Sequence, residues 1–288
     1  MIRKCALMLL TTLSTSWCTA TPIEYSTQGR TYLEESPTRH NNVMVLALHG
    51  GGGFAKYQAD HYGLETWAKQ YAWIVVYPNG YSRLPSGKFA TWNAGNCCGA
   101  ARDKNSDDIQ FLDYVINDVV QRHGMQRPKI FITGMSNGAM MAYRYACERP
   151  DQVTALAAVA GTDNSNCTPT KPVPMLHIHA KDDTHVLFNG GAGPEAFEGR
   201  ENAVTSFTSV AKSLDKWMRV NRSGGVATTV YRQGDARCER MPEGVEVRWC
   251  ITETGGHSWP GMKSMRKSSN TSLDATDYIG KFFKSYSP

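Results

Sequence analysis

The chain has 288 residues and a formal net charge of +5, with 31 basic side chains against 26 acidic ones. This small excess, without a block of like charges, does not favour a nucleic acid or a membrane as partner. The length suits one large domain with an extensive core.

The first twenty residues have the features of a secretory signal peptide. Arg3 and Lys4 form a basic start, Cys5–Leu13 is apolar but too short to cross a bilayer, and Cys18–Ala20 ends in small residues. A lipoprotein anchored through the cysteine of that last stretch is an alternative, which the bulky Trp17 before it disfavours. We expect residues 1–20 to be removed near Ala20, and residues 21–288 to form a single secreted or periplasmic domain.

An even set of cysteines remains after that cleavage, and in an exported chain such a set indicates disulfides. Cys238 and Cys250 flank a turn signal at 241–244, so they can face each other across a hairpin. The remaining cysteines allow three pairings, in which we expect the adjacent Cys97 and Cys98 to take different partners. These remaining cysteines are Cys97, Cys98, Cys147 and Cys167. A metal site is the weaker alternative, because C-x-x-C spacing is absent from the sequence.

Apolar runs typical of strands alternate with amphipathic segments typical of helices. The expected strands are Val43–Leu48, Trp73–Tyr77, Ile130–Thr133, Leu156–Val159, Met175–His179 and Val245–Thr252, and the expected helices are Tyr62–Gln70, Asp108–His123, Ala139–Glu148 and Ser206–Val220. This alternation predicts an α/β fold with a mostly parallel sheet covered on both faces.

Two features around residue 100 have both a structural and a functional interpretation. The segment Gly80–Ser106 lacks periodicity, and loops of this length are uncommon unless they are functional or cross-linked. Trp92 within it either lines a binding pocket or packs under the loop. Asp107 and Asp108 open a predicted helix, where capping is a simpler role than catalysis.

The segment Gly134-Met135-Ser136-Asn137-Gly138 is a G-x-S-x-G motif between an expected strand and an expected helix. This context is that of a nucleophile elbow, in which a sharp turn exposes a serine hydroxyl at the sheet edge. Glycine is required on both sides because the turn is strained and its neighbours lie close. Without the context, a turn that happens to contain a serine would explain the motif equally well.

A serine nucleophile needs a base and a carboxylate that orients the base. In α/β-hydrolases these groups follow the serine in the order acid, then histidine. Here Asp182 and Asp183 follow one expected strand and His257 follows the last one. Carboxyl ends of parallel strands meet at one sheet edge, so we expect His257 to be the base for Ser136.

The other histidines have simpler interpretations. His177 and His179 alternate on one strand and could bind a metal, but without a third ligand in view we expect structural roles. His123 ends a helix and suits its dipole, while His61 and His185 are expected at the surface or a pocket rim.

Two backbone donors are expected for an oxyanion that forms beside Ser136. One is the N–H of Asn137, at the start of the helix after the nucleophile. The other is Gly51, in the run His49–Gly53 that follows a buried strand and has the H-G-G-G pattern of hydrolase loops. A flexible glycine turn is the alternative interpretation of that run.

The chain resembles the secreted feruloyl esterase and polyhydroxybutyrate depolymerase family of α/β-hydrolases, related to carbohydrate esterase family 1. The matching stretches are Leu48–Gly50, Tyr77–Gly80, Trp92–Gly99, Asp107–Leu112, Gly134–Tyr145 and Gly256–Gly261. The W-N-x-G-x-C-C-G and G-H-x-W-P-G runs are more specific than the elbow. The resemblance implies an α/β-hydrolase fold. We also expect no large cap domain, and substrate contacts by Trp92, by Trp259 and by His185, which is unusual at its position in the family.

The resemblance also selects the acid. Family members tend to read His-Gly-x-x-Asp, then two residues and Val-Pro-Tyr, which places the acid at Asp183 and makes Asp182 its neighbour without that role. Here Ala180 replaces the usual glycine and Leu187 the usual proline. These departures affect the shape of the loop but remove no catalytic group.

The expected activity is serine-dependent hydrolysis of carboxylic esters through an acyl-enzyme, without a metal or organic cofactor. Only a short connection lies between Gly161 and Val173, where many lipases insert a lid, so we expect an open site for bulky or polymeric esters. Feruloyl esters of plant polysaccharide are favoured over polyhydroxybutyrate and other polyesters. An acetylxylan esterase, a serine peptidase of the same fold and a non-catalytic binding protein are further alternatives.

Overall fold

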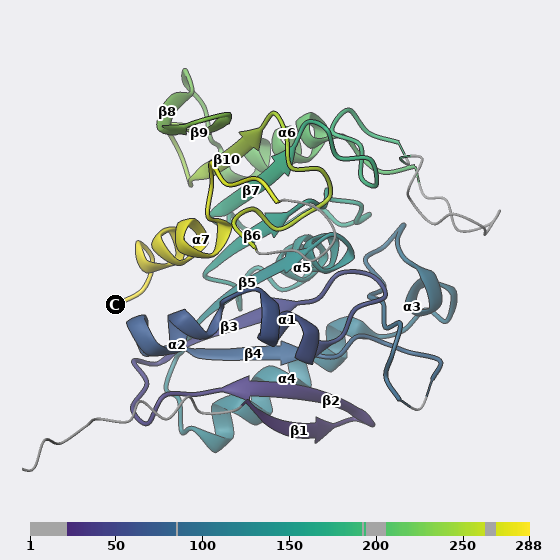
Figure 1. Cartoon of the computed structure of the whole chain (residues 1–288). Coiled ribbons are helices and arrows are strands. Elements are labelled where there is room, and N and C mark those ends of the chain that lie inside the picture. The colour runs from purple at the N-terminus through teal and green to yellow at the C-terminus, as the bar shows by residue number, and fades with distance from the viewer. Residues whose placement is uncertain (1–21, 85, 192, 194–205, 263–268) are drawn as a thin grey trace, which may run out of the picture.

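A computed structural model describes residues 22–84, 86–191, 193, 206–262 and 269–288 (Figure 1). The expected signal peptide at residues 1–20 lies outside the described residues. No helix within these described ranges is long and apolar enough to cross a membrane.

A 10-stranded sheet forms the centre of the molecule, in the order β1-β2-β4-β3-β5-β6-β7-β10-β9-β8. The central strands from β4 to β10 are parallel, and antiparallel strands are added at both edges. The bounds are β1 Ile23–Thr27, β2 Arg30–Glu35, β3 Val43–Leu48, β4 Ile74–Pro78, β5 Lys129–Met135, β6 Ala155–Val159, β7 Met175–Ala180, β8 Thr228–Gln233, β9 Ala236–Arg240 and β10 Val247–Thr252.

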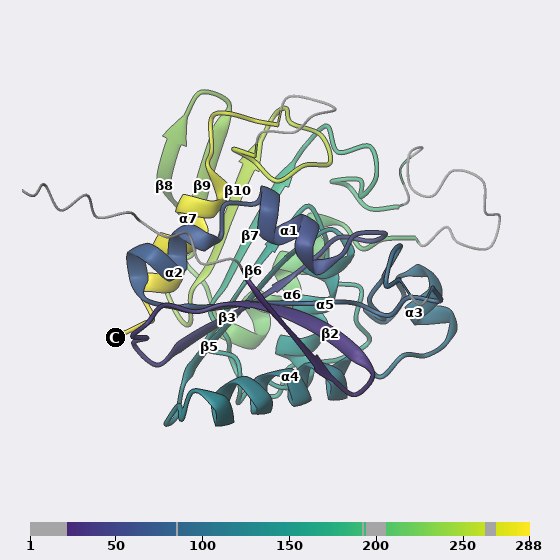
Figure 2. The same ribbon diagram turned by 60° about the horizontal axis from the view of Figure 1, so that its bottom comes forward.

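Helices cover both faces of this sheet. Figure 2 shows α1, α2 and α7 on one side and α4, α5 and α6 on the other. The bounds are α1 Ala55–His61, α2 Glu65–Tyr71, α3 Gly99–Asp103, α4 Asp108–Arg122, α5 Asn137–Glu148, α6 Val210–Asn221 and α7 Ala275–Lys284. The fold is therefore the predicted α/β architecture with a doubly covered sheet.

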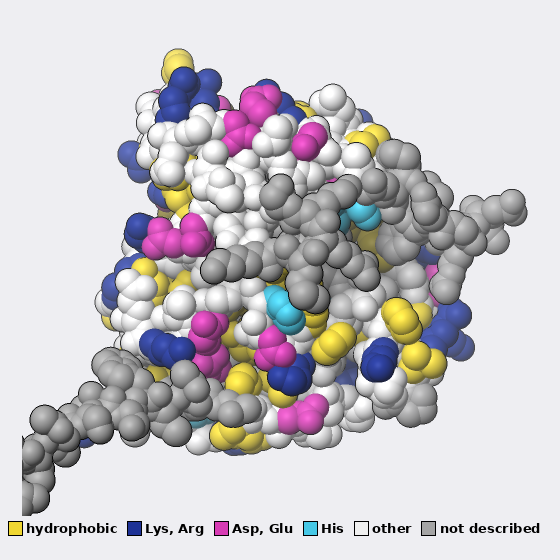
Figure 3. All heavy atoms as spheres, in the orientation of Figure 1, with side chains coloured by type: hydrophobic (Ala, Val, Ile, Leu, Met, Phe, Trp, Pro, Cys, Tyr) yellow, Lys and Arg dark blue, Asp and Glu magenta, His cyan; other side chains and the backbone are white. Residues whose placement is uncertain are grey.

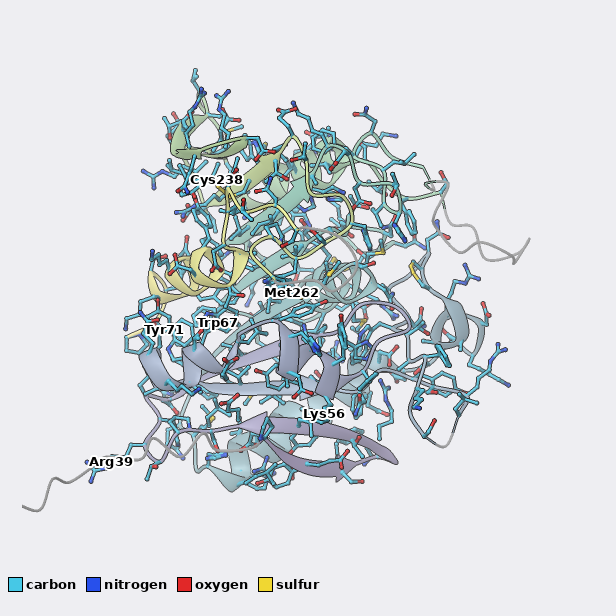
Figure 4. All side chains as sticks on the ribbon, in the orientation of Figure 1. Arg39, Lys56, Trp67, Tyr71, Cys238 and Met262 are labelled. Carbon is cyan, nitrogen blue, oxygen red and sulfur yellow. A yellow bond between two sulfur atoms is a disulfide. The ribbon has the colours of Figure 1, made fainter. Side chains whose placement is uncertain are left out.

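The two faces have separate hydrophobic cores because successive strand residues point to opposite sides. On β3, Met44, Leu46 and Leu48 pack with α4, α5 and α6. Val43, Val45 and Ala47 pack with α1, α2 and α7. All six positions are fully buried, which explains why a central parallel strand is a continuous apolar run in the sequence. Figure 4 labels Trp67 of α2, whose ring meets Phe283 of α7 in this second core.

All the strands and helices expected from the sequence are present, with shifted ends. The sequence patterns missed the edge strands β1, β2, β8 and β9 and the helices α1, α3 and α7. The helices α1 and α3 are short, and α7 follows a loop rather than a strand. Between β6 and β7, residues 160–174 form no helix or strand, so no cap is inserted there.

Disulfides join Cys238 to Cys250 and Cys147 to Cys167. The first links directly opposed residues of β9 and β10, as the hairpin predicts. The expectation that Cys97 and Cys98 take different partners is wrong: they are joined to each other. Their peptide bond is cis, which brings the two α-carbons to 3.1 Å, and the remaining cysteines have already paired.

Candidate active site

Ser136 lies on a sharp turn between β5 and α5, with φ 56° and ψ −122°. This conformation is rare for a residue with a side chain and is stabilised only by close packing around the turn. A Cβ on Gly134 would lie 2.5 Å from the Gly138 carbonyl, and one on Gly138 would lie 2.2 Å from the Leu48 carbonyl oxygen. Both flanking glycines are thus required by close backbone approaches.

The three side chains proposed for the triad lie in one hydrogen-bonded line. Ser136 Oγ is 2.8 Å from His257 Nε2, and His257 Nδ1 is 2.8 Å from Asp183 Oδ2. A carboxylate accepts only, so Nδ1 carries the proton and Nε2 is left to accept the serine hydroxyl. The three residues follow β5, β7 and β10, whose carboxyl ends meet at one edge of the sheet.

The Asp183 carboxylate is buried and fully hydrogen-bonded. Its Oδ1 accepts the backbone N–H groups of His185 at 2.8 Å and Val186 at 2.9 Å. Its Oδ2 faces His257 and also lies 3.3 Å from His179 Nε2. Burial alone would raise the pKa of Asp183, but hydrogen bonds from His179 and His257 outweigh burial and hold that pKa well below its usual range. The acid is therefore ionised throughout the neutral range.

The glycine loop after β3 lies against the elbow. A Cβ on Gly50 would be 3.6 Å from the Ser136 Cβ, and one on Gly51 would be 3.5 Å from the Asn137 Cβ. The residues predicted to supply the two oxyanion donors, Gly51 and Asn137, are thus neighbours beside the serine. Their role as donors remains a prediction.

The buried side chain of His49 holds the start of this glycine loop through two hydrogen bonds. Its Nε2 accepts the Gly80 N–H at 2.9 Å, so Nδ1 carries the proton and donates to the Gly50 carbonyl at 2.8 Å. Burial lowers the pKa of His49 to about 4. A neutral imidazole therefore ties the loop after β3 to the loop after β4.

The Asn137 side chain holds the long loop that precedes α4. Its Oδ1 accepts the Trp92 N–H at 2.7 Å, and its Nδ2 donates to the Trp92 carbonyl at 2.9 Å. The Trp92 indole N–H donates to the His49 carbonyl at 3.0 Å. The residue after the nucleophile is thus paired with the loop through both amide atoms.

The structure corrects two of the expected substrate contacts. Trp92 and Trp259 are both 0% exposed, and neither lines the cavity beside Ser136. Trp92 fills the core under the loop, and Trp259 donates its indole N–H to Thr276 and packs on Tyr62. Their large apolar rings stabilise more when buried than at a wet pocket wall, so packing is their role.

His185, the third expected contact, does line the cavity. Its ring stacks on His257 with centroids 4.6 Å apart and an interplanar angle of 17°. The cavity has a volume of about 1230 Å³. Its apolar walls include Tyr57, Tyr62, Met135 and Met262, and its polar walls include Asp235, Thr254, Asn270 and Ser272. Figure 3 shows both basic and acidic side chains on the described part of this face of the molecule.

The same region contains a cluster that could hold a metal ion. Asp183, His185 and His257 offer ligand atoms within 4.8 Å of one another. Both ring nitrogens of His257 are already engaged, one with the acid and one with Ser136. A metal ion bound through His257 would have to displace one of those hydrogen bonds.

The sequence patterns assigned two residues, Asp182 and His179, no part in placing the triad. Asp182 accepts the backbone N–H groups of Gly255 and Gly256, so it holds the loop that carries His257. Its position beside Asp183 was the only available signal. His179 was expected to be structural, and its approach to Asp183 follows from the turn after β7, which the alternation of strand residues does not reveal.

Asp107 and Asp108 have structural roles, as expected, and not catalytic ones. Asp107 caps α4 by accepting the Gln110 N–H at 3.0 Å. Asp108 is buried and pairs with Arg30 at 2.6 Å.

Comparison with known proteins gives several esterases. A feruloyl esterase B from Piromyces equi is 26% identical over 194 residues, which cover 64% of this chain and 34% of that protein. A probable feruloyl esterase C from Aspergillus clavatus is 32% identical over 176 residues, which cover 57% of this chain and 58% of that protein. The matches thus span between a third and three fifths of these relatives. No family model matches the chain.

Among solved structures, an acetyl xylan esterase from Aspergillus awamori superimposes with a TM-score of 0.61 at 15% identity, over 83% of this chain and 94% of that one. At that identity the match establishes the fold, which is that of the α/β-hydrolases. Within this class, the chain is similar in sequence to feruloyl esterases over part of their length.

Proposed function

We propose that this protein is an exported serine carboxylester hydrolase that acts on bulky esters of the feruloyl type. The observation that carries the proposal is the line of contacts from Ser136 Oγ through His257 to Asp183, at 2.8 Å in each step. Relatives named as feruloyl esterases support the same chemistry. Secretion rests on the expected signal peptide.

In the proposed reaction, Ser136 Oγ attacks the ester carbonyl while His257 Nε2 takes its proton. Asp183 keeps His257 in the tautomer that can accept, and stabilises the imidazolium that forms. The N–H groups of Asn137 and Gly51 receive the negative charge on the carbonyl oxygen. His257 then protonates the departing alcohol, and water releases the acid from the acyl-enzyme by the same steps.

The cavity supports a bulky substrate. Its volume of about 1230 Å³ is at or above the upper range of ordinary small-molecule sites. Tyr57 and Tyr62 can contact an aromatic acyl group, while the polar walls around Asn270 suit an alcohol with many hydroxyls, such as a sugar. This combination favours a hydroxycinnamoyl ester of a polysaccharide over an aliphatic polyester.

The test uses the secreted protein with methyl ferulate, acetylated xylan and a suspension of polyhydroxybutyrate. We expect release of ferulate, with loss of at least about a thousandfold in kcat for Ser136→Ala. Clearing of the polyester without ferulate release would assign the polyester alternative, and acetate release alone would assign an acetyl esterase.

A second measurement separates these enzymes from a binding protein and from a peptidase. We expect a fluorophosphonate to label the native protein and not Ser136→Ala. Unchanged hydrolysis in that variant would refute the proposed nucleophile. Cleavage of peptide substrates at rates above those for esters would instead support a peptidase.

A further inference from the structure

His179 is a buried histidine that the proposed reaction does not use. It lies near the end of β7, two residues after His177, and both imidazoles are no more than 1% exposed. Their rings stack with centroids 5.3 Å apart. A histidine costs more to bury than an apolar side chain, so this placement needs a cause other than packing.

The contacts of His179 supply such a cause. Its Nε2 lies 2.8 Å from the Val186 carbonyl oxygen and 3.3 Å from Asp183 Oδ2. Both neighbours are acceptors, so Nε2 carries a proton and is shared between them. Its Nδ1 has no hydrogen-bond partner among the residues that the structure describes. The ring is therefore oriented by what Nε2 donates to.

The shared oxygen is the one that faces the base. Asp183 Oδ2 receives the His257 Nδ1–H at 2.8 Å, while Oδ1 is occupied by two backbone donors. The donors on Oδ1 fix one end of the carboxylate, and His179 adds a donor at the other end. Rotation of the carboxylate away from His257 would break contacts at both ends.

We propose that His179 is a positioning residue for the triad: it holds Asp183 Oδ2 toward His257 by donating its own Nε2–H to that oxygen. The inference rests on the proposed function, because it needs Asp183 to act as the acid. His179 itself does not line the substrate cavity.

Several other ionisable groups lie near Asp183. The side chains of His257 and His185 face it from the loops after β10 and β7, and Asp182 precedes it in the chain. Asp182 turns its carboxylate to the Gly255–Gly256 backbone instead. His177 lies behind His179 and bonds Tyr143, so it contacts the acid only through His179.

The test compares His179→Gln with His179→Asn. The Gln amide can reach Asp183 with an N–H at about the position of Nε2, while the Asn amide is too short. Both variants place a neutral amide in the same buried site, so we expect them to disturb the surrounding packing to a similar extent. His177→Asn is a further control, because it disturbs the same buried layer without removing a donor from the acid.

We expect His179→Asn to lower kcat on methyl ferulate by about tenfold or more with KM nearly unchanged, and His179→Gln to recover most of that loss. Without the donor, the Asp183 charge is less dispersed and stabilises the His257 imidazolium more strongly. The acidic limb of the kcat/KM profile should therefore move to higher pH in His179→Asn and stay in place in His177→Asn.

The proposal is overturned if His179→Asn and His177→Asn lose thermal stability alike while kcat and the acidic limb remain those of the wild type. It is also overturned if His179→Gln and His179→Asn are equally impaired. If neither variant folds, the same comparison is made with His179→Ala, which leaves space for an imidazole, with and without added imidazole, and failure of rescue counts against the proposal. Failure of the proposed function is separate, because it would appear as absent hydrolysis and absent fluorophosphonate labelling in the wild type.

Discussion

The Asp182 carboxylate accepts the backbone N–H of Gly256 at 2.7 Å and that of Gly255 at 3.3 Å. Asp182 and Asp183 thus both help to position His257, through different contacts. Asp183 orients the imidazole ring, and Asp182 holds the backbone that carries it. Glycine at both loop positions leaves this backbone otherwise free to move, so the Asp182 contacts restrict the position of the base.

Asp182→Ala should loosen the loop that carries His257. We expect kcat to fall about three- to tenfold, because the base spends less time in line with Ser136, with little change in thermal stability. Asp182→Asn keeps an acceptor oxygen and should lose less. Steady-state kinetics check this, with the exposed Asp151→Ala as the matched control. Equal kcat in Asp182→Ala and the control would contradict the assigned role.

Acidification should destabilise the protein through its buried neutral histidines. The pKa of His49 is about 4 in the folded state, against about 6.5 in an unfolded chain. The unfolded chain therefore binds more protons between about pH 6.5 and pH 4, and stability falls as pH decreases through that window. The effect of His49 alone amounts to at most about 3 kcal/mol. Burial also lowers the pKa of His177, in the same direction.

Urea unfolding at pH 7 and pH 5 measures this loss. His49→Gln removes one titrating group, so the variant should be less stable at pH 7 but lose less on acidification than the wild type. An identical pH dependence in both proteins would show that His49 is not kept neutral by the fold.

Gly138→Ala should prevent correct formation of the elbow. The new Cβ would lie 2.2 Å from the Leu48 carbonyl oxygen and 2.5 Å from that of His49, and backbone atoms cannot move aside cheaply. We expect a loss of several kcal/mol in stability together with loss of fluorophosphonate labelling. Gly224→Ala is the matched control, because its Cβ meets only Glu243 at 3.6 Å. Near-wild-type labelling in Gly138→Ala would contradict this packing.

Removal of the Cys147–Cys167 disulfide should destabilise the fold without altering the chemistry. This bond joins the end of α5, which starts at the nucleophile, to the connection after β6, across a separation of 20 residues. The double Ala variant should lose about 2–4 kcal/mol in unfolding free energy, with kcat within twofold at temperatures where it is folded. A large fall in kcat without loss of stability would indicate that the bond shapes the site directly.

The central parallel strands and the chain order of the proposed site could be predicted from the sequence because they depend on local signals. β3 is a continuous apolar run, and Ser136 lies between two glycines at which a Cβ would collide with nearby backbone atoms. The antiparallel strands at both sides of the sheet were missed because their apolar pattern is weak; β2, for example, buries Glu34 and Glu35. In β8 most residues are exposed, so no apolar alternation marks it.

Contacts across the fold account for the remaining errors. Trp92 looked like a pocket residue because it lies in a long loop, but the depth of that loop depends on its pairing with Asn137. The role of His179 depends on how the turn after β7 folds back. Neither relation has a periodic signature, so residue spacing alone could not predict either one.

The double hydrogen bond between Asn137 and the Trp92 backbone has a practical consequence for engineering this protein. Libraries that randomise the residue after the nucleophile would detach the loop at the same time as they vary the elbow, and most members would be lost for reasons unrelated to substrate choice. Diversity is better introduced at Tyr57, Thr254 and Ser272, which face the cavity from separate segments. Changes there can be combined while the connection between elbow and loop is kept.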